Sequence, residues 1–105
     1  MSRRPAKVEN VIEIVKAAIA SRQFRISAHA AKRMEERDIT SPDLIQVLAA
    51  GYHEARKDEF KEEYSSWSYA IRGKTVDARN LRFAVAIEAP GFVVVTAIDL
   101  DREEV

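Results

Sequence analysis

The chain has 105 residues, which is enough for one compact domain and too few for two. The absence of cysteine excludes disulfide bonds and thiolate metal sites, and no apolar run approaches the roughly 20 residues of a membrane-spanning helix. The formal net charge is zero, but residues 1–37 carry a net +5, residues 38–66 a net −4 and residues 67–105 a net −1. We therefore expect a cytoplasmic protein with a local anionic partner and no general affinity for DNA or membranes.

Three helices are predicted in the first half of the chain. Residues 8–19 place apolar side chains at helical spacing, and residues 28–37 form a second helix with Ser27 as its N-cap. An extended link joins these two helices. The third helix follows a Thr-Ser-Pro start and ends before Gly51.

The pattern changes to strands from residue 52 onward. Residues 52–56 read as a weak strand, and the acidic residues 57–66 as a loop or hairpin arm. Residues 67–73 and 79–88 alternate apolar and polar side chains, and residues 92–98 are the most strongly β-prone segment.

This order predicts an α+β fold in which the helices pack on one face of a four-stranded antiparallel sheet. We expect a single domain over residues 1–105, with a helical part at 7–51, a sheet part at 52–98 and an acidic tail at 99–105. The other face of the sheet would be free, and small side chains there would let a partner approach closely. The small side chains are those of Ala70, Ala84 and Ala86.

The stretch SAHAAKRMEER, residues 27–37, is the most informative segment for function. His29, Arg33 and Arg37 share one stripe of the predicted helix, because they are four residues apart. A histidine in the first helical turn suits general acid–base chemistry, and arginines suit a phosphate. A local packing role for His29, with solvated or ion-paired arginines, fits the same spacing.

The sheet half contributes further cations and hydroxyls. Arg72 and Lys74 adjoin the turn at Gly73, and Tyr69 is close to them in sequence but also fits the core. Thr96 lies in an otherwise apolar strand, either as a satisfied buried hydroxyl or as a site residue. Cleavage of RNA without a metal needs a proton acceptor, cations and a proton donor, and residues of these types are present.

No metal or cofactor is expected. His29 and His53 are far apart, and neither has a second ligand at helical spacing. The three glycines are scattered and form no phosphate-binding loop.

Four segments together resemble a family of small prokaryotic proteins that carry a domain of unknown function. They are ISAHAAKRMEERDI, WSYAIRGK, RNLRFAVAIE and FVVVTAI. The resemblance covers about residues 24–98, and its first motif is the most specific. That family is grouped with RelE-like toxins, in the superfamily of barnase and the colicin ribonucleases. The resemblance implies the same fold, with helices on a four-stranded antiparallel sheet.

The resemblance implies a toxin of a type II toxin–antitoxin pair that acts as a metal-independent endoribonuclease. Its substrate would be RNA, free or on the ribosome, and its protein partner a cognate antitoxin. The residues expected to be catalytic are His29 as base or acid, with Arg33 and Arg82 as phosphate clamps. The residues expected to bind substrate are Arg37, Arg72, Tyr69, Lys74 and Thr96.

Two alternatives remain open at this point, because the zero net charge departs from the basic character of such toxins. One is a non-catalytic protein-interaction module with the same fold. The other is an RNA-binding domain that does not cleave its ligand.

Overall fold

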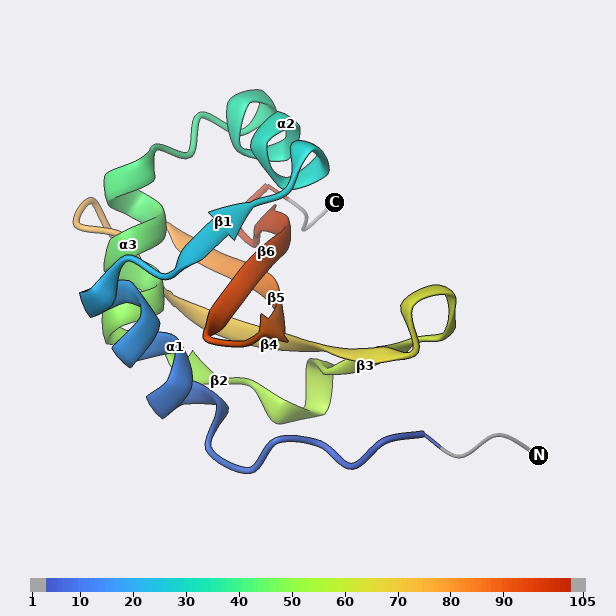
Figure 1. Cartoon of the computed structure of the whole chain (residues 1–105). Helices are drawn as coiled ribbons and strands as arrows, with labels where there is room; N and C mark the ends of the chain where they lie inside the picture. The colour runs from blue at the N-terminus through green and yellow to red at the C-terminus, as the bar shows by residue number, and fades with distance from the viewer. Residues whose placement is uncertain (1–3, 103–105) are drawn as a thin grey trace.

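The computed structural model describes residues 4–102, which fold into helices packed against one twisted sheet (Figure 1). The helices are α1 (Val11–Ser21), α2 (Ala28–Glu36) and α3 (Ser41–Ala50). The strands are β1 (Phe24–Ile26), β2 (Tyr52–His53), β3 (Glu59–Lys61), β4 (Ser66–Lys74), β5 (Asn80–Glu88) and β6 (Gly91–Asp99). Two short 3-10 turns, η1 (Ala55–Lys57) and η2 (Glu62–Tyr64), flank β3. The α+β class is confirmed.

The sheet is mixed, so the prediction of a four-stranded antiparallel sheet was wrong. Its strand order is β1-β6-β5-β4-β2, and β3 forms a further pair with β4. β1 runs parallel to β6, with Phe24 opposite Phe92. The segment predicted as an extended link therefore contains an edge strand. β1 is only three residues long, which is too short for a periodic pattern to show in the sequence. No local turn connects it to β6, so a hairpin signal is absent as well.

The helix starts follow local chemistry. The Ser27 Oγ accepts the Ala30 N–H at 3.1 Å, and Thr40 forms a capping box with Asp43 at the start of α3. The first helix begins at Val11 and not at residue 8. The Val8 N–H donates instead to the Tyr69 hydroxyl at 2.9 Å, which holds this residue outside the helix.

The core lies between α1, α3 and one face of the sheet, with α2 packed beside β6 (Figure 1). Alternate residues of β4 and β5 point into it, among them Tyr69, Ile71, Phe83 and Val85. The small alternate residues of the same strands face the other side, as predicted for the free face of the sheet.

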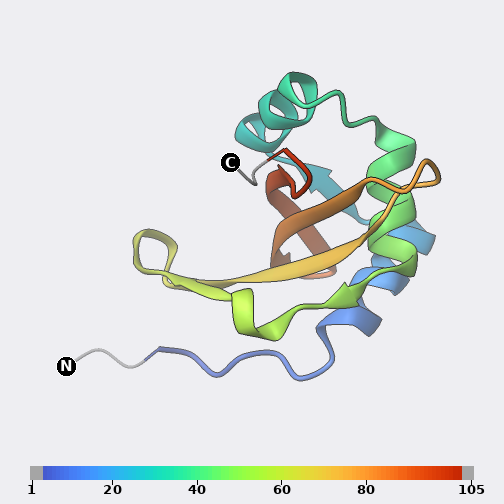
Figure 2. The same cartoon turned by 180° about the vertical axis from the view of Figure 1, so that it is seen from behind.

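Residues 4–10 form an extended arm that runs beneath the β3–β4 hairpin, as both views show (Figure 2). The Trp67 Nε1–H donates to the Pro5 carbonyl at 2.8 Å, and the Lys7 ammonium lies 2.6 Å from the Asp58 carboxylate. The Asp58 side chain is 1% exposed and also bonds His53 at 2.8 Å. The arm therefore contacts the rest of the fold through specific side-chain interactions, although it belongs to no helix or strand.

At the other end of the chain, β6 runs to Asp99, one residue into the segment predicted as an acidic tail. Asp99 is buried and accepts a hydrogen bond from Arg79 at 2.9 Å. The same guanidinium donates to the carbonyls of Arg37 and Asp38 and so ties the end of α2 to the sheet. Residues 103–105 of the predicted tail lie outside the described residues.

Candidate nucleic-acid interface

The face of the sheet opposite α1 and α3 carries two adjoining pockets, which together we call the groove. Ala84 of β5 lines the first pocket and Ala86 lines the second. Thr96 lies opposite Ala84, and Val93 opposite Ala86, on β6. Since alternate residues of a strand share one face, the pockets are neighbours on the same surface. Their volumes are about 330 and 550 Å³.

The first pocket, which we call the arginine pocket, is built around Arg82 and Thr96. The Arg82 Nε–H donates to Glu54 Oε1 at 2.7 Å, and Arg72 donates to Glu54 Oε2 at 3.3 Å. A third guanidinium, that of Arg56, lies 3.6 Å from the same carboxylate. Three cations therefore surround one anion, which leaves this cluster with a net positive charge.

Glu54 is the organising residue of this cluster, and it is only 5% exposed. The hydrogen bond from Arg82 is the main cause that lowers the pKa of the Glu54 carboxyl, and Arg72 acts in the same direction. Burial opposes them, since it disfavours the charged form. The carboxylate stays ionised at neutral pH and fixes both guanidinium groups.

Glu54 was not among the residues predicted from the sequence. A signal exists in the register of the sheet, where Arg72 lies directly opposite Arg82. Like charges in directly opposed cross-strand positions are destabilising unless a counter-charge accompanies them. Two opposed arginines require a nearby carboxylate, so this register, once known, indicates a counter-charge such as Glu54.

The second pocket, which we call the histidine pocket, lies between the start of α2 and the β3–β4 hairpin. His29, Lys61 and Tyr64 line it. Ser27 positions this end of α2, since it caps the helix and its hydroxyl donates to the Val95 carbonyl at 3.2 Å. The His29 ring is exposed and bonds no side chain in residues 4–102, and Tyr64 is 73% exposed. The exposed His29 imidazole and the exposed Tyr64 ring therefore line the same pocket, where a ligand can reach both.

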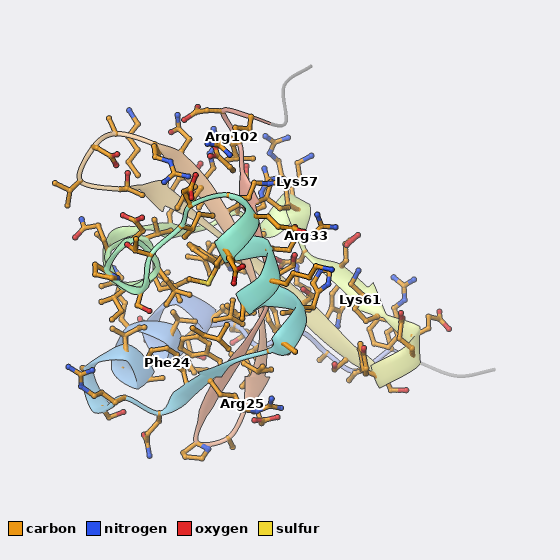
Figure 3. The ribbon with its side chains drawn as sticks, turned by 90° about the horizontal axis from the view of Figure 1, so that it is seen from above. Phe24, Arg25, Arg33, Lys57, Lys61 and Arg102 are labelled. Carbon is orange, nitrogen blue, oxygen red and sulfur yellow. The ribbon has the colours of Figure 1, made fainter. Side chains whose placement is uncertain are left out.

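The other residues of the α2 stripe lie outside both pockets. Arg33 projects from α2 toward the side of the molecule that carries Lys57 and Lys61 (Figure 3). Its guanidinium is 3.6 Å from Glu36 on the same helix. Arg37 is half-buried at the C-cap of α2. Arg33 therefore adds positive charge beside the groove, whereas Arg37 belongs to the end of the helix.

Two further predicted site residues, Tyr69 and Lys74, also lie outside the groove. Tyr69 is 3% exposed and lies in the core on the opposite face of the sheet, where its hydroxyl bonds Val8. Lys74 is exposed at the end of β4, opposite Asn80, and lines neither pocket. The structure thus gathers Arg82 and Thr96, with Arg72 behind them, and places His29 in the neighbouring pocket.

Within residues 4–102 no three histidine or acidic side chains are arranged to hold a metal ion. The described helices also lack the length and the apolar surface that crossing a bilayer requires.

Fold and groove together define a small α+β domain with a mixed sheet, whose polar groove is lined by cationic and acidic side chains. Residues 26–99 match the family described as a domain of unknown function, DUF4258, and the chain belongs to that family. A comparison with curated proteins and with solved structures finds no match. The residues that line the two pockets all lie within the matched segment, apart from Arg25, which is one residue before it. The arm and α1 precede the segment.

Proposed function

We propose that the groove binds single-stranded RNA and that the protein is a metal-independent endoribonuclease of the RelE-like toxin type. A cognate antitoxin would be its natural protein partner. The observation that carries the proposal is the arginine pocket, where Arg82 is held by a buried carboxylate one pocket away from the exposed His29. Guanidinium groups fixed in this way suit the oxygens of a phosphodiester.

The chemistry proposed is an internal displacement. The 2′-oxygen bonds to phosphorus as the bond from phosphorus to the 5′-oxygen breaks, and the product carries a 2′,3′-cyclic phosphate. One group must accept the 2′-OH proton and one must supply a proton to the leaving oxygen. His29 serves as the acid or the base, and Arg82 stabilises the charge on the phosphorane. Arg33 adds positive charge at the rim.

The groove is also suited to a single strand. Its floor is made of small side chains, Ala84 and Ala86, so a chain of nucleotides can lie close to the sheet. Tyr64 is exposed at its edge and offers a ring on which a base stacks. Single strands expose the base faces that such stacking needs.

The test is controlled expression of the chain in a bacterial host beside His29→Ala and a remote control, Lys16→Ala on the exposed side of α1. We expect growth arrest and RNA cleavage by the wild type and the control. Purified protein should cut a synthetic RNA in the presence of a chelator. Loss of a general acid or base should lower that rate by about 10²- to 10⁴-fold in His29→Ala, with an unchanged melting temperature.

Each contrary outcome identifies an alternative. Full activity of His29→Ala removes His29 from the mechanism. RNA that is bound and left intact by the wild type indicates a binding domain without cleavage. Normal growth with no RNA binding indicates a protein-interaction module.

A further inference from the structure

We propose that the arginine pocket is a preformed subsite for a phosphate group and that Glu54 is its positioning residue. Glu54 would act on the ligand through the guanidinium groups that it holds, chiefly that of Arg82. The identity of the ligand, a phosphodiester of single-stranded RNA, rests on the function proposed above.

The position of the Arg82 guanidinium is fixed by its surroundings. Arg82 lines the pocket, whereas Glu54 and Arg72 do not. The Arg82 Nε–H is bonded to Glu54 at 2.7 Å, and no residue among 4–102 bonds its two terminal nitrogens. The side chain of Arg82 is only 15% exposed, so the guanidinium has little room to rotate. The carboxylate therefore aims a pair of free N–H donors at one place, in the fork arrangement that binds a phosphate with two parallel hydrogen bonds.

The rest of the pocket also offers donors to a phosphate. Thr96 and Ser68 contribute hydroxyl groups to its lining, and Lys57 contributes an ammonium group. Two carboxylates also line it, and each is engaged by a cation: Asp58 by Lys7 and Glu59 by Lys61. The Lys57 ammonium group has no ion-pair or hydrogen-bond partner among residues 4–102, and the side chain projects on the same side as Arg33 (Figure 3). The pocket thus holds donors of three chemical kinds around the guanidinium. A phosphate oxygen accepts from all of them.

The charge of Glu54 and its hold on Arg82 predict opposite effects on binding, and this difference provides the test. Removal of the Glu54 carboxylate takes a negative charge away from a site for an anion, so electrostatics alone predicts tighter binding. If Glu54 instead holds Arg82 in place, its removal frees the guanidinium and weakens binding. The sign of the change separates the two roles.

The experiment measures the affinity for a fluorescent 2′-O-methyl RNA oligomer, which binds but has no 2′-OH to attack the phosphate. We expect Arg82→Ala to weaken binding about tenfold, as for loss of one charge-assisted contact. Glu54→Ala should weaken it about three- to tenfold despite the lost negative charge. Glu54→Gln retains an oxygen that accepts from Arg82 and should lie between wild type and Glu54→Ala. Glu13→Gln, an equal charge change on α1, should bind like the wild type.

A double variant tests whether Glu54 acts through Arg82. Glu54→Ala in the Arg82→Ala background should cause little further loss, since the two residues work as one unit. Inorganic phosphate should compete with the oligomer for the wild type and much less for Arg82→Ala. Melting temperatures of all variants identify any that fail to fold, in which case Glu54→Gln carries the comparison.

Tighter binding by Glu54→Ala, or additive losses in the double variant, would overturn the positioning role. Absence of oligomer binding by the wild type would overturn the subsite itself. The ribonuclease proposal fails separately: it fails if the oligomer binds with the expected pattern while unmodified RNA stays intact. Cleavage that is insensitive to both Arg82→Ala and Glu54→Ala would overturn the subsite and leave the ribonuclease.

Discussion

Glu54 is a buried carboxylate among guanidinium groups, so the stability of the fold depends on its ionisation. Arg82 and Arg72 hold its pKa below the ordinary value of 4.5. A group with a lowered pKa in the folded state contributes stability above its unfolded pKa and loses it as the pH falls through the folded one. Protonation of Glu54 would leave Arg72 and Arg82 opposite one another without a counter-charge.

The first prediction is that Glu54→Gln lowers the free energy of unfolding at pH 7 by about 1–3 kcal/mol. The stability of the wild type should decrease as the pH falls below 4.5, the ordinary pKa of the Glu54 carboxyl, and Glu54→Gln should make that decrease smaller. Urea denaturation at pH 7, 5 and 3.5 measures both effects. Glu13→Gln, on the exposed side of α1, should keep the wild-type dependence of the free energy of unfolding on pH. The same dependence in Glu54→Gln would contradict the role given to the Glu54 carboxylate.

At the residue scale, the sequence also shows how far a site can be predicted. Arg82, Thr96 and His29 were predicted because their types stand out in a strand or a helix. Tyr69 was also selected, although strand alternation places it on the face opposite Arg72. Which face is the core depends on how the strands pair. Glu54 lies outside the regular strands, and only the register that opposes two arginines shows its role.

At the scale of elements, the N-terminal arm is the least expected feature. It follows no helical or strand pattern, yet it contacts the β3–β4 hairpin at several points. Arg4 lies over the rings of Phe60 and Trp67, with 5.1 and 5.9 Å to the ring centroids. The Lys7 ammonium lies 5.1 Å from the Trp67 ring centroid and also forms the ion pair with Asp58. Cations over aromatic faces are worth about 0.5–1 kcal/mol each at exposed sites.

The second prediction concerns the docking of the arm. Trp67 is the single tryptophan of the chain, and its indole contacts the arm, so tryptophan fluorescence responds to release of the arm. Lys7→Ala should release the arm, shift the Trp67 emission to longer wavelength and lower stability by about 1–2 kcal/mol, because Asp58 loses a charged partner. The exposed Lys16→Ala should change neither quantity. An emission spectrum that is identical in Lys7→Ala and the wild type would show that the arm does not depend on this ion pair.

The helices were predicted well because their signals are local. The N-caps Ser27 and Thr40 and the end at Gly51 are each encoded within a few residues. β1, β2 and β3 are two or three residues long, and each is defined by its partner strand and not by its own pattern. Short strands of this kind take their structure from the tertiary fold.

At the scale of the whole molecule, the neutral net charge hides an uneven surface. Five cations line the groove beside four carboxylates: Arg25, Arg56, Lys57, Lys61 and Arg82 with Asp58, Glu59, Glu63 and Glu88. Three of these carboxylates, Asp58, Glu59 and Glu88, are occupied in ion pairs. A neutral protein can therefore present a small cationic site without the long-range attraction of a basic one. RNA binding should depend on few phosphates.

The third prediction follows from that count. If Arg82, Lys57 and Lys61 each neutralise one phosphate of a single strand, the logarithm of the association constant should fall with the logarithm of salt concentration with a slope of about −2. Lys57→Ala should make the slope shallower by about 0.7. Fluorescence anisotropy at several salt concentrations measures it. A slope steeper than about −5 would require many more contacts than the groove provides.

The parallel pairing of β1 with β6 also has a consequence for the order of folding. Phe24 stacks on Phe92 with 5.3 Å between the ring centroids, although most of the chain lies between them. A nascent chain can form its helices and the β4–β5 hairpin early, but β1 has no partner until β6 has been synthesised. The sheet is therefore completed last, by closure of a long loop, and such non-local contacts slow folding. Until that step, β6 presents a free edge to which any other extended segment can pair.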